Sequence, residues 1–271
     1  MSPRLLIYLA PHLLLVAVFL LPSGPALFVF TLWALFVTTM MLGMLRPRSG
    51  MFGANFWRAP GQPRVALTFD DGPHPDDTPA ILDILQRTGV RATFFMIGTR
   101  ARAHPELVRR VARAGHETGV HSDTHPWWFS LAGPARLNRE IRQPVRTMQE
   151  ILGRPPRFFR PPMGHKNFFL PGELAAAGLQ MATWSARSYD TLGRPPAKIR
   201  DLILARATPG GIILLHEGVR REPGKPSPTV VALEGIIEGL RARHLEPVSL
   251  GDLQRGSAAQ PGSLPQADPR S

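Results

Sequence analysis

Cysteine is absent from the 271-residue chain. Disulfide bonds, thiolate metal sites and a cysteine nucleophile are therefore excluded, and a metal ion could be bound only by His, Asp or Glu. Acidic residues are also few, because 20 Asp and Glu stand against 32 Lys and Arg and leave a formal net charge of +12. The basic residues are scattered and no nucleic-acid-binding motif accompanies them. An anionic membrane surface or an anionic lipid-linked substrate therefore explains this charge better than a nucleic acid does.

Charged residues are missing from two long stretches near the N-terminus, residues 5–21 and 26–45. The second stretch is long enough to span a bilayer, whereas the first is marginal and contains Pro11 and His12. A signal peptide would have a single shorter apolar run before a cleavage site with small residues, so the pair fits that alternative poorly. We expect residues 1–48 to form a membrane hairpin of two transmembrane helices. The alternative is one true span, with the first stretch interfacial or removed.

Arginines flank both stretches and bear on their orientation. Arg4 precedes the first stretch, and the second is followed by Arg46, Arg48, Arg58 and Arg64. A hairpin with both ends in the cytoplasm satisfies the positive-inside rule. A single span leaves the orientation ambiguous, so the sequence predicts a cell-membrane location but not the side on which the remaining chain lies.

Composition divides the rest of the chain into three parts. Residues 49–63 are rich in Gly, Pro and Arg and are expected to be a linker. Residues 64–252 alternate short apolar strands with amphipathic helical segments, which indicates an α/β fold with a parallel sheet or barrel and helices outside. In such folds the chemistry lies at the C-terminal ends of the strands. Residues 253–271 are expected to be a disordered tail, because Gly, Ser, Pro and Gln are abundant there.

Hydrophobic periodicity and Gly or Pro punctuation place the individual elements. A first strand starts at residue 65 and ends at two adjacent aspartates. Further strands are expected at residues 92–97, 116–120, 158–159, 181–184 and 211–215. Helices are expected at residues 78–87, 105–114, 134–152, 197–207 and 229–243.

The first strand and the turn after it, V-A-L-T-F-D-D-G-P-H-P at residues 65–75, carry two candidate functional carboxylates, Asp70 and Asp71. Adjacent side chains on a strand point to opposite faces, but at a strand end that opens into a turn both can face one cavity. Like charges at contact distance separate the two pKa values, so one carboxylate would bind a cation while the other stays free as a base. The alternative is a pair of aspartates that caps the following turn.

Two histidines, His121 and His125, follow the strand expected at residues 116–120. Residues four apart share one face if the segment turns helically, and metal sites use this spacing. Together with Asp71 they would form a three-ligand set with a position left open for water, which suits a catalytic zinc rather than a structural one. The alternative is an incidental His pair.

These motifs resemble those of the polysaccharide deacetylases, the NodB-homology or carbohydrate esterase family 4 group. T-F-D-D-G-P at residues 68–73 and H-S-x-x-H at residues 121–125 match the first two motifs of that family. R-P-P-M-G at residues 160–164 and L-L-H at residues 214–216 resemble the third and the fifth. The resemblance covers roughly residues 64–250, and as an ordered set the motifs are highly specific.

The resemblance implies a distorted (β/α) barrel of the NodB-homology type and metal-dependent hydrolysis of an N-acyl group on an amino sugar. By position, Asp70 would be the catalytic base. The metal ligands would be Asp71, His121 and His125, and these imidazole and carboxylate ligands would accept Zn²⁺, with Co²⁺ or Ni²⁺ as alternatives.

Three further residues gain roles from the resemblance. His216 would be the acid that protonates the leaving amine, and Arg160 would brace the base. The backbone N–H of Met163 would stabilise the oxyanion, as the corresponding residue does in the family. Outside the motifs, Arg160 would read as a surface arginine before a rigid turn, and His216 as a core histidine.

The chain departs from the family pattern at two places. Met163 stands where the family usually has an aromatic residue. In the fourth motif, at residues 184–191, Arg187 occupies the place of the first of two acids and Asp190 keeps the second. The first acid helps to orient the catalytic histidine in the family, so the support of His216 is open, with Asp190 or another carboxylate as a substitute. Arg187 could instead bind an anionic substrate group such as a phosphate.

Trp127 and Trp128 follow the His pair directly. Either ring could stack on a sugar, although aromatic packing explains them equally well. Asp123 and His116 are expected to be structural.

The sequence as a whole predicts a membrane-anchored, metal-dependent hydrolase of amide bonds. Its expected substrate is an N-acetylated or N-formylated amino sugar in a surface or lipid-linked glycan, and no nucleic acid is expected as a partner. The alternatives are an O-acetyl esterase that acts on a glycan and a non-catalytic carbohydrate-binding protein of the same fold. The acyl group, the glycan and the oligomeric state are not readable from the chain.

Overall fold

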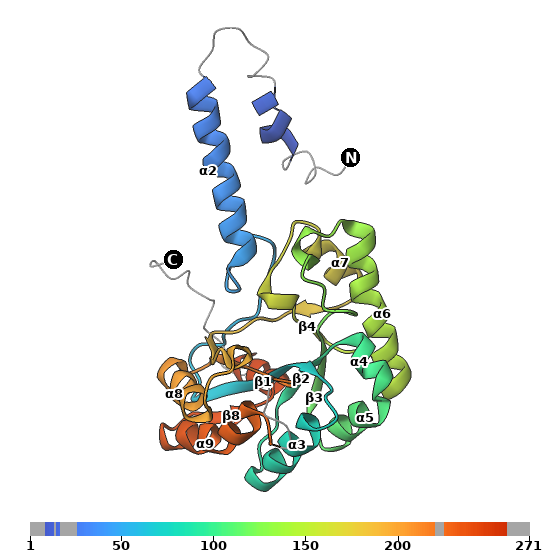
Figure 1. Ribbon diagram of the computed structural model, residues 1–271, viewed down its shortest axis with the longest axis vertical. Helices are drawn as coiled ribbons and strands as arrows, with labels where there is room; N and C mark the ends of the chain where they lie inside the picture. Colours follow the sequence, from blue (N-terminus) through green and yellow to red (C-terminus); the bar gives the residue numbers. More distant parts are fainter. Residues whose placement is uncertain (1–8, 14, 17–25, 220–224, 259–271) are drawn as a thin grey trace.

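A computed structural model describes residues 9–13, 15–16, 26–219 and 225–258 of the chain. One long helix, α2 (Ala26–Leu45), stands out from a domain in which helices surround a curled sheet (Figure 1). The sheet has eight strands in the order β5-β4-β3-β2-β1-β7-β6, and β8 pairs with β1. The strands are β1 (Arg64–Gly72), β2 (Thr93–Met96), β3 (Glu117–Val120), β4 (Phe158–Phe159), β5 (Gln180–Met181), β6 (Ala186–Arg187), β7 (Ile212–His216) and β8 (Glu246–Val248).

Every strand pair is parallel, and the sheet curls into a half-barrel. Within the described residues no pairing joins β5 to β6. The α/β prediction with a parallel sheet is therefore confirmed, and the open edge explains why the barrel is distorted rather than closed.

The helices cover the outer face of the sheet (Figure 1). Several begin with Pro in the first turn, where its missing N–H has no cost, and α3 ends at Gly89 with a φ of 67°, the left-handed conformation that glycine adopts without strain. The α-helices of the domain are α3 (Asp77–Thr88), α4 (Gly98–Ala103), α5 (Pro105–Arg113), α6 (Pro134–Leu152), α7 (Leu170–Ala176), α8 (Pro196–Arg206), α9 (Pro228–Ala242) and α10 (Leu250–Ala258). Short 3₁₀ turns are η1 (Phe129–Leu131), η2 (Pro162–Gly164) and η3 (Asp190–Leu192).

The central strand β1 is buried on both faces. Val65, Leu67 and Phe69 pack into the large hydrophobic cluster shared with the helices. Ala66 faces the opposite way, into a smaller cluster inside the curl of the sheet. Because side chains alternate along a strand, Asp70 falls on the same inner face as Ala66, at the C-terminal end of the strand.

One helix among the described residues, α2, is long and apolar enough to cross a membrane; residues Leu27–Leu45 have a mean hydropathy of 2.0. A signal sequence near the N-terminus would meet the same criterion. Residues 9–13 and 15–16 are helical, and Trp33 Nε1 on α2 donates a hydrogen bond to His12 Nδ1 at 3.1 Å. The expected turn of the hairpin lies outside the described residues, so the two-helix hairpin stays a prediction.

The segment expected to be a linker, residues 49–63, is packed against the domain. Phe56 forms a parallel bridge with Ala182, and Arg58 forms an antiparallel bridge with Gly211. Ala59 is 2% exposed. Residues 49–63 are therefore part of the domain rather than a separate linker, because these two bridges join them to the residue after β5 and to the residue before β7.

The chain between α2 and this segment is held by Lys166, which is buried. Its ammonium group donates hydrogen bonds of 2.7–2.9 Å to three backbone carbonyls, those of Arg46, Pro47 and Ser49. An ammonium group has three donors, so this arrangement uses all of them. The end of α2 is therefore fixed directly to the domain.

The prediction of a disordered tail from residue 253 was wrong for residues 253–258. Helix α10 continues to Ala258, and Leu253 is fully buried in the inner cluster together with Leu250. The abundance of small and polar residues in this segment predicted disorder, but these two leucines give the helix a buried face. Residues 259–271 lie outside the described part of the chain.

Candidate active site

The two aspartates at the end of β1 approach the same histidine, because Asp70 Oδ2 and Asp71 Oδ1 each lie 3.6 Å from His121 Nε2. Asp70 lies on the inner face by strand alternation, whereas regular alternation would turn Asp71 outward. The pairing of β1 with β2 shifts register between Asp70 and Gly72, and Asp71 has a φ of 69°. This bulge returns the Asp71 side chain to the inner side, so that Asp71 Oδ1 lies 3.6 Å from His121 Nε2.

The two histidines come together through a loop. A helical turn would place the two rings on one face, but residues 121–125 form none, and Ser122 and His125 have φ values of 62° and 51°. The His125 N–H donates to Ser122 Oγ at 3.0 Å, which closes the loop. The two histidines therefore converge as expected, although the condition of a helical turn is not met and the loop brings them together instead.

Asp71, His121 and His125 have the geometry of a metal site. Their ligand atoms lie within 4.8 Å of one another, and His125 Nε2 is also 3.6 Å from Asp71 Oδ1. Two ligands of a tetrahedral zinc ion lie about 3.4 Å apart, given metal–ligand distances near 2.1 Å. Asp71 Oδ1 is a buried oxygen without a hydrogen-bond donor among the described residues. The donor set and this free oxygen fit a divalent cation.

The surroundings of His121 favour the ligand form of its ring. Its Nδ1 lies 2.7 Å from the carbonyl oxygen of Arg160, so Nδ1 carries the proton and Nε2 presents its lone pair. Burial, reinforced by the neighbouring His125, lowers the pKa of His121 to about 3. The ring is therefore neutral at physiological pH, as metal coordination requires.

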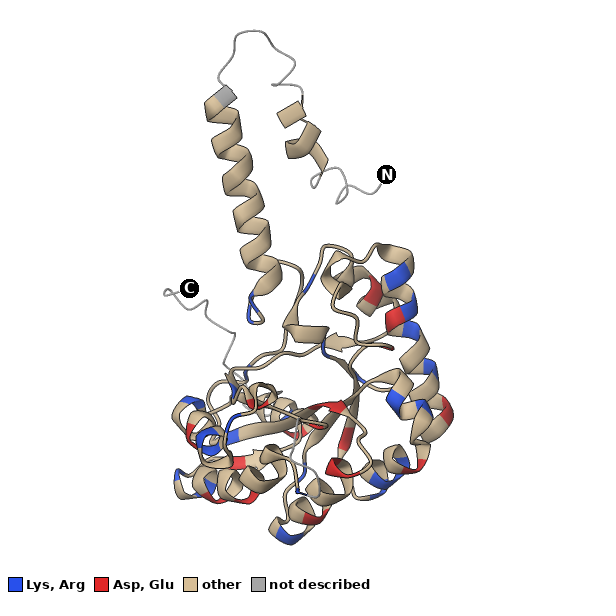
Figure 2. Cartoon of the chain, viewed as in Figure 1, with Lys and Arg blue, Asp and Glu red and all other residues tan. Residues whose placement is uncertain are grey.

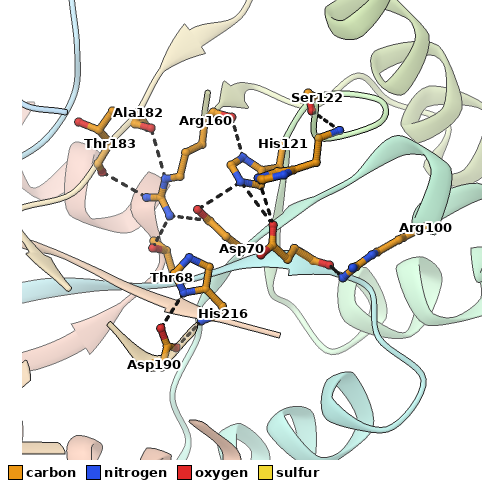
Figure 3. A network of polar contacts seen from close by, with 12 residues as sticks. Thr68, Asp70, Arg100, His121, Ser122, Arg160, Ala182, Thr183, Asp190 and His216 are labelled. Atoms are coloured by element: carbon orange, nitrogen blue, oxygen red, sulfur yellow. Dashed lines mark hydrogen bonds and ion pairs between the residues drawn. The ribbon is translucent and has the colours of Figure 1, made fainter. Parts of the chain in front are cut away.

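Asp70 is held by Arg160, as Figure 3 shows. Arg160 Nη1 donates to Asp70 Oδ1 at 2.7 Å and to Thr68 Oγ1 at 2.8 Å. Arg160 is fully buried, which rules out the alternative of a surface arginine. Burial raises the pKa of Asp70 and outweighs the opposing effect of Arg160. A carboxylate with a raised pKa and one fixed oxygen is suited to accept a proton on the other.

His216 lies on β7 beside Asp70 of β1, since the two residues pair across the parallel strands. Its Nδ1 lies 2.8 Å from Asp190 Oδ1, and its backbone N–H donates to Asp190 Oδ2 at 2.8 Å. Burial acts to lower the pKa of His216, but the Asp190 carboxylate outweighs burial and raises it to about 9. His216 is therefore protonated at neutral pH, with Nε2 left to act on a substrate.

Asp190 was considered for two positions, in contact with the oxyanion or substrate and beside His216 as a substitute for the missing motif acid. Its side chain is fully buried, and both oxygens accept hydrogen bonds, one of them also from Thr229 Oγ1 at 3.0 Å. Asp190 therefore supplies the support of His216 that the replacement of the first motif acid by Arg187 had left open.

The remaining predicted residues lie around the mouth of the half-barrel. Met163 has a φ of 57° and a side chain that is 40% exposed, and it lines a large cavity together with Arg187. Trp127 is 76% exposed on the loop after His125. The oxyanion role of Met163 and the substrate contacts of Arg187 and Trp127 stay predictions.

Sequence reasoning missed Glu140, which supports the metal-site loop from α6. Its carboxylate accepts hydrogen bonds from the backbone N–H groups of Asp123 and Thr124 at 3.0 and 2.9 Å. A signal was present, because Glu140 falls on the apolar face of its helix between Leu137 and Ile141. A charged residue at such a position requires buried partners.

Comparisons with known proteins agree with this geometry. The family model described as polysaccharide deacetylase matches residues 58–182. A chitooligosaccharide deacetylase from Bradyrhizobium sp. (strain ANU 289) is 36% identical over 202 residues, which cover 71% of this chain and 91% of that protein. A peptidoglycan-N-acetylglucosamine deacetylase from Bacillus cereus is 33% identical over 215 residues, covering 78% and 98%.

A solved structure shows the same arrangement of elements. The peptidoglycan deacetylase PdaC from Bacillus subtilis superposes with a TM-score of 0.66 at 30% identity, over 74% of this chain and 94% of that chain. The similarity extends over nearly the whole of each of these relatives. The chain therefore belongs to the polysaccharide deacetylase family, the NodB-homology or carbohydrate esterase family 4 group.

Proposed function

We propose that this protein is a metal-dependent deacetylase that removes an N-acetyl or N-formyl group from an amino sugar in a surface or lipid-linked glycan. The observation that carries the proposal is the convergence of three kinds of group at one mouth of the half-barrel. These are a set of three metal ligands, the carboxylate of Asp70 held by the buried Arg160, and the protonated His216 on the neighbouring strand.

Asp70 is suited to act as the general base. Arg160 occupies Oδ1, whereas Oδ2 lies 3.6 Å from His121 Nε2 and so borders the metal ligands. A water molecule that attacks the acyl carbon would give its proton to Oδ2. Thr68 and the carbonyl of Thr183 fix the guanidinium, so the base keeps one orientation through the reaction.

His216 is suited to act as the general acid. Asp190 binds the Nδ1 side of the ring, so the proton available to substrate is on Nε2. An amine is a poor leaving group unless it is protonated as the carbon–nitrogen bond breaks. His216 would deliver that proton, and the backbone N–H of Met163 would stabilise the oxyanion of the acyl group.

The metal ligands would be Asp71, His121 and His125. A divalent cation bound there, most simply Zn²⁺, would supply Lewis-acid polarisation of the acyl carbonyl. Co²⁺ and Ni²⁺ suit the same ligands, because imidazole and carboxylate groups do not select strongly among these ions.

We also assign α2 as a membrane anchor. Its surface is apolar and without charge along its length, and charged residues begin in the loop below it (Figure 2). The hydrogen bonds of Lys166 hold the end of α2 against the loop that follows β4, and Thr183 Oγ1, in the loop after β5, donates to the carbonyl oxygen of Pro47. Exposed apolar side chains in the surrounding loops include Met51, Trp127, Leu131, Met163 and Leu192. A catalytic mouth that faces the membrane favours a membrane-attached substrate over a free soluble polymer.

The proposed organisation of the chain follows from this assignment. Residues 1–48 form the anchor, and residues 64–252, extended to residue 258 by α10, form the catalytic domain. Because residues 49–63 bridge strands of the domain, experiments should use the full chain rather than a fragment that starts at residue 64.

The test is acetate release from N-acetylated chito-oligosaccharides by the full chain in detergent, with Zn²⁺ and with chelator. Asp70→Asn should lower the rate by about 10²–10⁴-fold, because it removes the base. The same variant keeps Asp71, His121 and His125, so its zinc content should equal that of the wild type. Release from O-acetylated but not from N-acetylated sugars would identify an esterase, and zinc binding without release of acetate or formate from any N-acetylated or N-formylated sugar would contradict the proposal.

A further inference from the structure

A cavity of about 1170 Å³ lies between the end of α2 and the rim of the candidate active site. One wall is formed by the last turns of α2 and by residues 46–51. The opposite wall includes Met163, Trp184, Arg187 and Tyr189. A ligand in this cavity would therefore touch both the proposed membrane anchor and the catalytic rim.

The cavity is strongly positive. Four arginines line it, namely Arg46, Arg48, Arg187 and Arg206, and its lining contains no carboxylate. None of the four forms an ion pair with Asp or Glu of the described residues, in contrast to Arg87, Arg110, Arg200 and Arg241 on the outer helices. An adjoining cavity of about 360 Å³ shares Arg48 and Arg206 and adds Arg58. Uncompensated guanidinium groups around one space form an anion site.

Two of the four guanidinium groups are held by backbone carbonyls without using all of their donors. Arg48 donates to the carbonyl oxygen of Ser185, and Arg206 Nη1 donates to that of Arg187 at 3.0 Å. Each guanidinium has five N–H donors, so donors remain for a ligand.

Aromatic rings contact the arginine side chains of the two cavities. The guanidinium carbons of Arg187 and Arg206 lie 4.0 and 5.1 Å from the centre of the Tyr189 ring, and those of Arg48 and Arg58 each lie 5.5 Å from the Trp57 ring. Arg187 and, more weakly, Arg206 lower the pKa of the Tyr189 phenol, as expected where positive charge accumulates. Stacked arginines with free edges are pre-oriented to bind phosphate oxygens in pairs.

Several residues that line the cavity are close in the backbone to candidate catalytic residues. Arg187 on β6 pairs with Leu214 of β7, two residues before His216. Tyr189 immediately precedes Asp190, which holds His216, and Met163 lies in the loop that follows Arg160. An anion bound in the cavity would therefore lie next to the position at which a sugar meets His216.

We propose that this cavity binds the phosphate or diphosphate that joins an amino sugar to a membrane lipid, and thereby holds the sugar at the catalytic residues. The inference rests on the proposed deacetylase function and specifies its substrate class. The lipid would extend beside α2, and the phosphoryl group would lie among Arg46, Arg48, Arg187 and Arg206. This arrangement gives Arg187 a role in place of the missing motif acid.

The first experiment measures binding of farnesyl diphosphate to the full chain in neutral detergent, by quenching of tryptophan fluorescence, since Trp57 and Trp184 line the cavity. Arg187→Gln and Arg206→Gln should each weaken binding by about tenfold, because each removes charge-assisted hydrogen bonds. Arg109→Gln is the matched control. This substitution removes the same charge from an exposed position on α5, an element that does not line the cavity. Equal losses for Arg109→Gln and the two cavity variants, or no binding to the wild type, would overturn the proposal.

Two further probes identify the source of the anion. Inorganic diphosphate that binds as tightly as farnesyl diphosphate would assign the cavity to a free phosphate. Nanodiscs that contain phosphatidylglycerol and bind through the same arginines would assign it to a phospholipid headgroup. Either result would overturn the assignment to a substrate.

The second experiment compares acetate release from diphosphate-linked N-acetylglucosamine on a prenyl chain with release from an uncharged alkyl glycoside of the same sugar. The ratio of kcat/KM for the two substrates should favour the diphosphate-linked sugar and should fall by about tenfold in Arg206→Gln. Deacetylation of the uncharged glycoside without any binding of prenyl diphosphate would preserve the proposed function and overturn the site. Prenyl diphosphate binding without deacetylation of either sugar would support the anion site and contradict the proposed function.

Discussion

Single residues set the protonation states on which the proposed chemistry depends. The carboxylate of Asp190 keeps His216 protonated at neutral pH, whereas burial alone would make the ring neutral. Burial acts on Asp70 in the direction that makes a carboxylate a better proton acceptor. The two groups therefore have opposite roles although they lie on paired positions of neighbouring strands.

The pair Asp190 and His216 makes a testable prediction about pH. Because the pKa of His216 is raised to about 9, the protonated acid persists until the pH exceeds that value, and kcat/KM should fall as the pH rises through it. Asp190→Asn removes the group that raises the pKa, so the alkaline fall in kcat/KM should move to lower pH and the rate at pH 8 should drop by about tenfold or more.

A profile of kcat/KM between pH 5 and 10 measures this shift, and Asp201→Asn, at an exposed position on α8, serves as the control. An alkaline fall at the same pH in Asp190→Asn and wild type would contradict the role of Asp190.

The same pKa has a consequence for stability, because the His216 pair stabilises the fold below about pH 6.5 and this contribution is lost as the pH rises through about 9.

The sequence predicted most of the chemistry at this scale but not its support. Asp70, Asp71, His121 and His125 were placed together by their positions at strand ends. Asp190 was only one of the carboxylates considered for the support of His216, because sequence spacing does not show that η3 turns its side chain toward that ring. Glu140 was overlooked because it is remote in sequence from the loop it holds.

At the scale of elements, α6 contributes a positioning residue to the metal site. Glu140 binds the backbone of the loop that carries His125, so Glu140→Gln should lower zinc affinity by about 10–100-fold, the usual effect of losing a partner that orients metal ligands. Competition with a chromogenic chelator measures this affinity without reference to activity. Glu150→Gln, at an exposed position on the same helix, should bind zinc as the wild type does. Identical zinc affinity in Glu140→Gln and wild type would show that the loop keeps its shape unaided.

The elements themselves were predicted unevenly. The long amphipathic helices α6 and α9 were placed within a residue of their observed ends, because a 3.6-residue period is clear over such lengths. The strand expected at residues 181–184 corresponds instead to β5 at Gln180–Met181 and to β6, which starts at Ala186. Strands of two residues have no period to detect, and their pairing depends on neighbours that are distant in sequence.

At the scale of the whole molecule, the prediction concerns whether α2 is retained in the mature protein as a membrane anchor. We expect the mature protein to keep residues 26–45 and to remain in the membrane pellet after extraction with alkaline carbonate, because α2 is apolar throughout and its end is bonded to the domain. Intact-mass measurement of the purified protein checks the first point directly. A mass that lacks this segment would identify a cleaved signal sequence and would contradict the assignment of α2 as an anchor.

The attachment made by Lys166 has a kinetic consequence. If α2 lies in a bilayer, as we propose, the attachment would leave the catalytic residues no flexible tether and would keep them near the lipid headgroups. Enzyme and lipid-linked sugar would then meet by lateral diffusion in a plane, and the rate would follow the number of substrate molecules per unit area of membrane. Adding inert lipid would slow turnover even when the amounts of enzyme and substrate in the sample stay the same.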